Sequence, residues 1–232
     1  MKTQILFSVA LLTGSLLASQ ASPADDVTSA AQKLAGESSY TWNTTTVVPE
    51  SSRFKPGPVD RKIVKGDVTY LKQSFGDNTT EIYMKGTNAV LTDPDGGWQT
   101  LADMDDSQGP GRFLGGMIRN FKTPAAQAAT LVAGCKDLEQ TNGAYASDLT
   151  EDAVKKMMTF RRRGGTAPTI SNPSGTATFW INNGELTKYE VHVKGTTTFN
   201  GNDVNLERDT TVEFSDVGST TINIPDDVKK KL

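Results

Sequence analysis

Apolar and polar residues alternate over much of the first half of the chain, which is typical of strands with one buried face. The first such run, 39–48, gathers aromatic and β-branched residues on one side and predicts a strand. Shorter runs predict strands at 60–65, 68–75, 79–85 and 88–92, and 96–104 ends the series. The Gly- and Asn-containing turns between them are too short for helical crossovers, so neighbouring strands should pair antiparallel.

The alternation returns in the last hundred residues, where Asn142-Gly143 and Asn183-Gly184 are strong turn signals. We expect one hairpin formed by 136–141 and 144–148 and a second formed by 174–182 and 185–199. Two further strands are expected at 206–216 and 220–224.

Helical spacing replaces the alternation in a few segments. Pro23 suits an early helical position and Gly36 a stop, and Thr123 suits an N-cap. Asp148 or Thr150 could cap a third helix. We expect helices at 22–35, 123–134, 148–160 and, as a short closing element, 225–232.

The segment GRFLGGMIRNF (111–121) carries an apolar stripe at helical spacing. The stripe consists of Phe113, Leu114, Met117, Ile118 and Phe121. The two adjacent glycines within it each cost about 1 kcal/mol of helical stability relative to alanine. Either close packing against a neighbour explains them, or the segment is a cover that shifts as a ligand enters.

The order of these elements predicts an α+β fold, with one large antiparallel sheet and helices grouped on one face. The 232-residue chain can bury about 70% of its unfolded surface, which suffices for one core. The net charge of −3 is spread along the chain, so no positive surface for nucleic acid or anionic membranes is expected.

Residues 1–21 are expected to be a signal peptide, and 22–232 a single exported domain. Lys2, the apolar run 5–12 and the small residues near position 21 fit a cleaved signal that is too short to span a membrane. Cys135 is the only cysteine, so neither an internal disulfide nor a lipid anchor after the signal is expected. We therefore expect a periplasmic or otherwise exported protein, with Cys135 as a buried thiol.

The sequence contains few side chains that could act in catalysis, so we expect neither an enzyme nor a cofactor or metal site. His192 is the only histidine and should share a solvated strand face with Glu190 and Lys194. A zinc site would need His192 and the distant Cys135. The sequence DPDG (93–96) opens like a calcium loop but has Met104 where a glutamate is needed, which favours a turn.

The strongest family pattern lies near the C-terminus, over 177–195 and 208–228. It comprises an aromatic strand, a glycine turn, an alternating strand, and then Phe214-Ser215-Asp216, Gly218, Ile222 and Pro225. This pattern resembles the bacterial lipoprotein-carrier superfamily, in its LppX/LprG-like lipid-binding branch and in relatives of the periplasmic carrier LolA. Residues 30–42 are similar to the first helix and strand of that family.

The resemblance implies an incomplete antiparallel barrel, whose concave face is covered by helices that leave an apolar cavity for acyl chains. It implies that Val212, Phe214, Ile222 and Ile224 point toward the helices. The candidate cavity residues are apolar side chains expected on that face: Trp42, Tyr70, Ile82, Met84, Phe113, Leu114, Met117, Ile118, Phe121, Phe179, Ile181, Val191, Val212, Phe214 and Ile222.

Two departures from the family limit the transfer. The mycobacterial branch is anchored through a lipidated cysteine that this chain lacks, which implies a soluble periplasmic form. No particular arginine matches a cavity arginine of the carriers, so Arg112, Arg119 and the basic triplet 161–163 are unassigned. The triplet is either a solvated loop or a site for an anionic head group at a cavity rim.

The leading hypothesis is a non-enzymatic carrier for a lipid or lipoprotein acyl chain, with transient membrane or envelope-protein partners. The alternative is a cell-envelope interaction or sensor module that uses the same fold with a filled core. A hydrolase acting through carboxylates ranks third.

Overall fold

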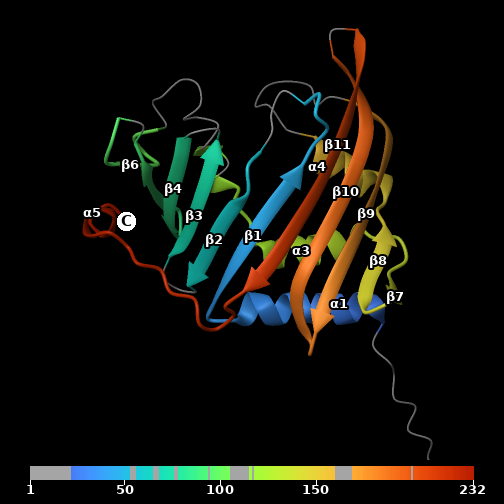
Figure 1. Ribbon diagram of the computed structural model, residues 1–232, viewed down its shortest axis with the longest axis horizontal. Coiled ribbons are helices and arrows are strands. Elements are labelled where there is room, and N and C mark those ends of the chain that lie inside the picture. Colours follow the sequence, from blue (N-terminus) through green and yellow to red (C-terminus); the bar gives the residue numbers. More distant parts are fainter. Residues whose placement is uncertain are drawn as a thin grey trace, which may run out of the picture.

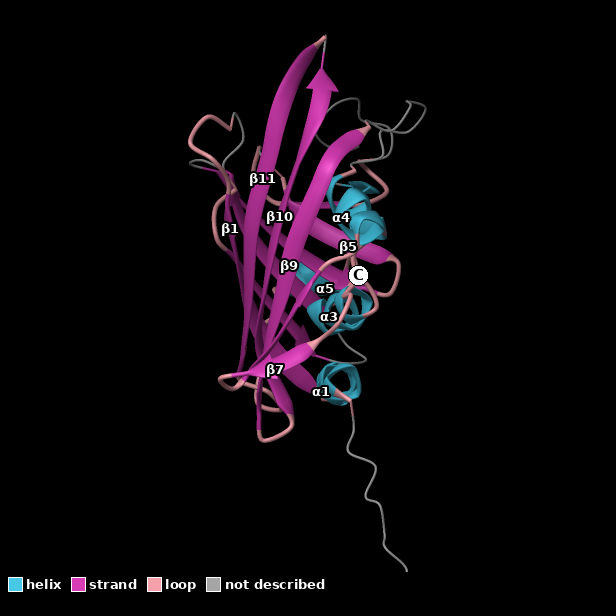
Figure 2. Cartoon of the chain, turned by 90° about the vertical axis from the view of Figure 1, so that its right-hand side faces the viewer, coloured by secondary structure: helices cyan, strands magenta, loops and turns pink. Residues whose placement is uncertain are grey.

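The computed structural model describes residues 22–52, 56–64, 68–75, 78–93, 95–104, 115–116, 118–159, 169–199 and 201–232. Its strands form one eleven-stranded antiparallel sheet in the order β6-β5-β4-β3-β2-β1-β11-β10-β9-β8-β7. The sheet is open, with β6 and β7 at its edges, and it curves toward the helices (Figures 1 and 2). The predicted α+β class, an incomplete antiparallel barrel, is confirmed.

The strand bounds follow the alternating runs closely. They are β1 (Ser39–Val47), β2 (Val59–Val64), β3 (Thr69–Phe75), β4 (Asn78–Lys85), β5 (Asn88–Thr92), β6 (Trp98–Thr100), β7 (Glu139–Thr141), β8 (Ala144–Asp148), β9 (Ile170–Asn182), β10 (Glu185–Phe199) and β11 (Asn202–Ser215).

The described helices are α1 (Pro23–Gly36), α3 (Pro124–Val132), α4 (Glu151–Met158) and α5 (Asp226–Lys229). Helices α1, α3 and α4 begin directly after a capping residue, whereas α5 has no side-chain cap. The hydroxyls of Ser22, Thr123 and Thr150 each accept a hydrogen bond from a first-turn backbone N–H of α1, α3 and α4 respectively.

Helices α1, α3 and α4 all lie on one face of the sheet, which we call the inner face (Figure 2). α1 contacts α3, β9 and β10, and α4 contacts β9 and β10. The largest core cluster lies between these helices and the strands, with Trp42, Phe179 and Tyr189 almost wholly buried. Burial of this apolar surface is the main favourable term for the fold.

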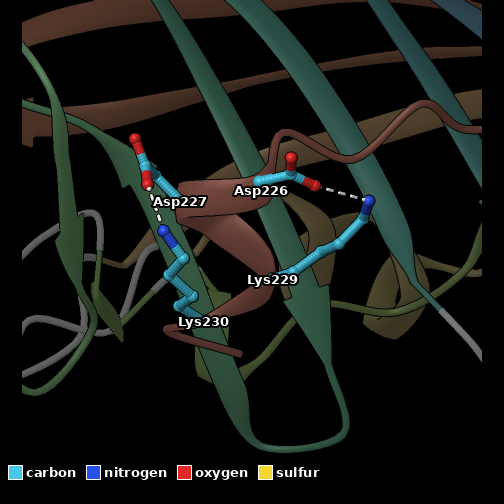
Figure 3. A network of polar contacts seen from close by, with 4 residues as sticks. All are labelled: Asp226, Asp227, Lys229 and Lys230. Carbon is cyan, nitrogen blue, oxygen red and sulfur yellow. Dashed lines mark hydrogen bonds and ion pairs between the residues drawn. The ribbon is translucent and has the colours of Figure 1, made fainter.

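The C-terminal segment 216–232 crosses to the opposite, outer face of the sheet, where α5 lies beside β4 and β6 (Figure 1). Val228 of α5 is fully buried against Val68, Tyr83 and Val90. The charges of α5 point away, in pairs between Asp226 and Lys229 (2.9 Å) and between Asp227 and Lys230 (3.0 Å) (Figure 3).

The predicted strand at 220–224 is wrong, because this segment has no strand pairing. After β11 ends, the Gly218 N–H donates to the Ser39 carbonyl at 2.7 Å and the chain leaves the sheet. Both edges of β1 are already occupied by β2 and β11, so no ladder position is open for another strand there.

None of the helices that the structure describes is both long enough and apolar enough to span a membrane. Residues 1–21, the expected signal peptide, lie outside the described part of the chain.

Candidate functional site

Strand register aligns six inner-face side chains in one row across the sheet, which we call the central row. It consists of Leu91, Ile82, Leu71, Arg61, Trp42 and Phe214, from β5, β4, β3, β2, β1 and β11 in turn. Four of the six are at most 5% exposed, namely Leu91, Ile82, Leu71 and Trp42. The row is therefore an apolar track across half of the sheet, with one cation in it.

The next row on the inner face lies about 7 Å further along the strands, since alternate residues face the same way. It runs through Val59, Thr44, Val212, Tyr189 and Phe179. Thr46 and Thr210 follow in the row beyond. On β1, the inner face thus changes from aromatic at Trp42 to hydroxyl-bearing at Thr44 and Thr46.

Arg61 is the polar centre of this surface. Its Nη1 donates to the Thr44 hydroxyl oxygen at 2.8 Å, whereas its Nε is enclosed and has no hydrogen-bond partner. Burial lowers the pKa of the Arg61 guanidinium, and electrostatic interaction with Tyr189 opposes that shift. Burial also raises the pKa of the Tyr189 phenol, whose hydroxyl lies 3.4 Å from Gln127 Oε1 on α3.

The cover over the central row comes from the segment that precedes α3. The Phe121 ring stacks on the Trp42 indole, with centroids 6.3 Å apart and planes at 26°. Ile118 is buried, with Leu101, Met104 and the central-row side chains of β3–β5.

Close packing explains one of the two adjacent glycines but not the other. A Cβ on Gly115 would lie 3.3 Å from Leu101 Cδ1, whereas a Cβ on Gly116 would meet nothing within 4 Å. Gly116 therefore weakens its helical segment without an evident packing reason.

Most of the predicted cavity residues do lie together on the inner face. Those placed there are Trp42, Ile82, Met84, Ile118, Phe121, Phe179, Ile181, Val191, Val212 and Phe214. Whether they contact a ligand stays a prediction. Phe113, Leu114 and Met117 lie outside the described residues, as do Arg112 and the triplet 161–163.

The placement expected for Tyr70, Ile222 and Ile224 is wrong, because all three pack on the outer face. The Tyr70 ring lies 5.0 Å from that of Tyr83, on the side of β3 opposite Leu71. β3–β5 are apolar on both faces, since the C-terminal segment covers the outer one.

Two of the hollows in the described part of the molecule lie away from the central row, and neither is lined by it. One, of about 390 Å³, lies by the β4–β5 turn, with Thr87, Asn88, Leu101, Arg119 and Lys231 among its lining residues. The other, of about 10 Å³, lies between α1 and β10, beside Lys33 and Glu185.

Groups that could perform catalysis are scattered. His192 lies on the outer face as expected, with Nδ1 2.6 Å from Asp209 Oδ1 and Nε2 3.6 Å from Glu207 Oε1. Burial raises the pKa of the Cys135 thiol to about 11, which disfavours a reactive thiolate. Among the described residues, no cluster of three or more His, Cys, Asp or Glu side chains could bind a metal ion.

Arg61 was not predicted as a site residue, although the sequence contains a pattern that could have identified it. Val59, Arg61 and Ile63 alternate with polar residues in VDRKIV, which places the arginine on the buried face of β2. The alternation identified the strand, and the charge within its apolar face was the overlooked feature.

Solved structures with a similar arrangement include two mycobacterial proteins. The lipoprotein LppX of Mycobacterium tuberculosis is 12% identical, over 88% of this chain and 98% of its own, with a TM-score of 0.47. LprF of Mycobacterium bovis is also 12% identical, over 89% and 97%, with a TM-score of 0.44.

A DUF1329 family protein of Desulfovibrio piger is 10% identical, over 89% of this chain and 96% of its own, with a TM-score of 0.31. No family model and no curated protein sequence matches the chain. The LolA-like part of the resemblance stays a prediction.

Proposed function

We propose that the protein is an exported, non-enzymatic carrier that takes up the acyl chain of a lipid or lipoprotein against the central row. Residues 1–21 act as its signal peptide, and 22–232 form the mature single domain. A membrane or an envelope protein delivers the acyl chain and another receives it.

The observation that carries this proposal is the contact of Ile118 and Phe121 with the central row, in a segment that contains Gly116. Ile118 and Phe121 cover Ile82, Leu71 and Trp42, next to Gly116, where an added Cβ would meet nothing within 4 Å. A glycine without a packing role lowers the stability of a helical segment, and segments of low local stability are the ones that move when ligands bind. Opening would expose an apolar track several strands wide.

Ligand entry requires displacement of the cover, because Trp42, Ile82 and Leu91 are almost wholly buried. The gain from burying a ligand is about 25 cal/mol per Å² of apolar surface, or about 0.8 kcal/mol per methylene. A chain of ten methylenes therefore offers about 8 kcal/mol before the costs of opening and of association are subtracted.

The test begins with protein purified from its host and analysed by native and denaturing mass spectrometry for co-purified lipid. Delipidated protein is then titrated with a fluorescent fatty acid, with competition by unlabelled chains of increasing length. Saturable one-site binding that strengthens with chain length is expected. Absence of both co-purified lipid and saturable binding would refute the carrier function.

Dense packing in the other half of the inner core favours the alternative, an envelope interaction module. Ala128, Val154 and Phe179 are fully buried between the helices and β8–β10. A module with a filled core would present a partner surface instead, and cross-linking in envelope extract would yield one protein partner and no lipid.

A further inference from the structure

Arg61 places a positive charge in the middle of the apolar central row. Its register neighbours are Leu71, which is 5% exposed, and Trp42, which is 1% exposed. The Arg61 side chain is partly buried, with its Nε enclosed. A guanidinium keeps its proton at any physiological pH, so this position cannot avoid the desolvation cost of its charge by becoming neutral.

Among the described residues, no carboxylate forms an ion pair with Arg61, and the hydrogen bond that its guanidinium makes there goes to the neutral hydroxyl of Thr44. Buried charges in proteins are normally paired with an opposite charge and fully hydrogen-bonded. Arg61 meets neither condition, since its Nε also lacks a partner.

Arg208 on β11 is a second arginine on the same face, and its Nε likewise has no hydrogen-bond partner among the described residues, but its guanidinium lies at the end of a helix. Its Nη2 donates to the Met157 carbonyl, in the last turn of α4, at 3.3 Å. The carbonyl end of a helix carries partial negative charge, which compensates the cation. Arg61 has no such compensation among the residues that the structure describes.

We infer that Arg61 is the counter-ion for an anionic head group on the ligand, so that the carried molecule is an acidic amphiphile rather than a neutral lipid. The inference rests on the proposed carrier function. The planar guanidinium suits a carboxylate or a phosphate, either of which can accept two parallel N–H bonds from it.

The surroundings of Arg61 suit a head group on one side and an acyl chain on the other. Thr44 and Thr46 provide hydroxyls on β1, one and two rows from the central row. Leu71, Ile82 and Leu91 continue the apolar row over three strands, a span of about 14 Å. The chain would lie along these three side chains with its charge at Arg61.

The experiment compares ligands that share an acyl chain and differ in charge. Palmitate is paired with hexadecanol for the carboxylate, and lysophosphatidic acid with monopalmitoylglycerol for the phosphate. Each competes with a neutral fluorescent alkyl probe for wild-type protein, Arg61→Gln and the control Arg208→Gln. Folding of each variant is checked by circular dichroism and thermal unfolding.

Wild-type protein should bind one anionic member about 10- to 100-fold more tightly than its neutral partner, as expected for hydrogen bonds to charged groups. A preference for palmitate over hexadecanol would identify the head group as a carboxylate, and a preference for lysophosphatidic acid over monopalmitoylglycerol would identify it as a phosphate. Arg61→Gln should reduce the preference to about twofold or less, by weakening the binding of the anionic member more than that of its neutral partner. Arg61→Lys should restore part of the preference, and Arg208→Gln should keep it.

Equal binding of charged and neutral partners by the wild type would overturn the inference and leave the carrier function intact. An equal loss of charged and neutral binding in a folded Arg61→Gln variant would do the same. Failure of every amphiphile to bind would instead refute the carrier function itself. If Arg61→Gln does not fold, the inference is tested by the preference of the wild type for the anionic ligand and by the part of that preference that Arg61→Lys retains.

Discussion

The ring of Phe121 lies stacked on the indole of Trp42, and this contact joins the segment before α3 to the middle of the sheet. Phe121 also packs against the cluster formed by Ile82, Met84 and Ile118, so it bridges two apolar clusters on the inner face. Movement of the Phe121 ring would remove its stacking contact with Trp42.

Gly116→Ala should stabilise the cover and slow ligand exchange. Alanine removes about 1 kcal/mol of helical cost, and its methyl group meets nothing within 4 Å. The free energy of unfolding should rise by about 0.5–1 kcal/mol, and stopped-flow release of a fluorescent fatty acid should slow severalfold.

Gly36→Ala is the matched control, because Gly36 is also helical and has open space around its Cβ position, but lies at the end of α1. It should leave the release rate unchanged. Equal slowing by both variants would argue against a movable cover.

Gly175→Ala should destabilise the fold without a specific effect on the cover. An added Cβ would meet the His192 carbonyl oxygen, and it would lie 3.3 Å from Val154 Cγ2 of α4. Overpacking of this kind costs about 1–3 kcal/mol, measurable by urea unfolding. Wild-type stability in this variant would mean that α4 does not lie this close to β9.

Arg61→Met should increase the stability of the ligand-free protein, because it completes the apolar row with a side chain of similar length. Replacing buried ionic groups with apolar ones often stabilises a protein by about 1–4 kcal/mol, and we expect about 1–2 kcal/mol here. Arg208→Met should instead be destabilising, since the α4 carbonyl loses its donor. A large stability loss in Arg61→Met would assign Arg61 a structural role.

Alkaline pH should destabilise the protein through its five tyrosines. Burial is the main cause that raises the pKa of each of them, Tyr40, Tyr70, Tyr83, Tyr145 and Tyr189. Above about pH 10 the unfolded chain loses tyrosine protons that the folded chain keeps, so the free energy of unfolding falls as pH rises. Below about pH 9 the tyrosines contribute no pH dependence.

Urea unfolding at several pH values, with tyrosinate absorbance followed in parallel, measures this effect. Early ionisation of the tyrosines in native protein, near their ordinary pKa, would contradict it.

Short-range sequence patterns were sufficient to predict most of the helices and strands. Capping by Thr123 and Thr150 and the Asn-Gly turns are short-range effects, and the structure confirms the helices and hairpins that they predict. One-sided alternation likewise located Trp42, Phe179 and Val212 on the inner face.

The features that the sequence could not predict depend on contacts between segments that are far apart in the chain. Residues 220–224 alternate like a strand, but β2 and β11 already occupy both edges of β1. Tyr70 looks like a core residue from its neighbours alone, and only the distant C-terminal segment determines that it is buried on the outer face. The position of Arg61 could be predicted from the sequence, whereas the absence of a counter-ion among the described residues required the structure.

The central claim is that an acyl chain occupies the central row after Phe121 is displaced. Trp42 reports on that row directly, whereas Trp98 and Trp180 lie on the outer face, with the Lys188 amine 4.7 Å from the centre of the Trp180 ring. Trp98→Phe combined with Trp180→Phe leaves Trp42 as the sole indole, and Trp42→Phe combined with Trp98→Phe leaves Trp180 as the control.

Each protein is titrated with a bromine-labelled fatty acid, which quenches tryptophan fluorescence only at close contact. The account predicts saturable quenching of Trp42 and none of Trp180. Unquenched Trp42 at ligand saturation, or equal quenching of both indoles, would contradict it.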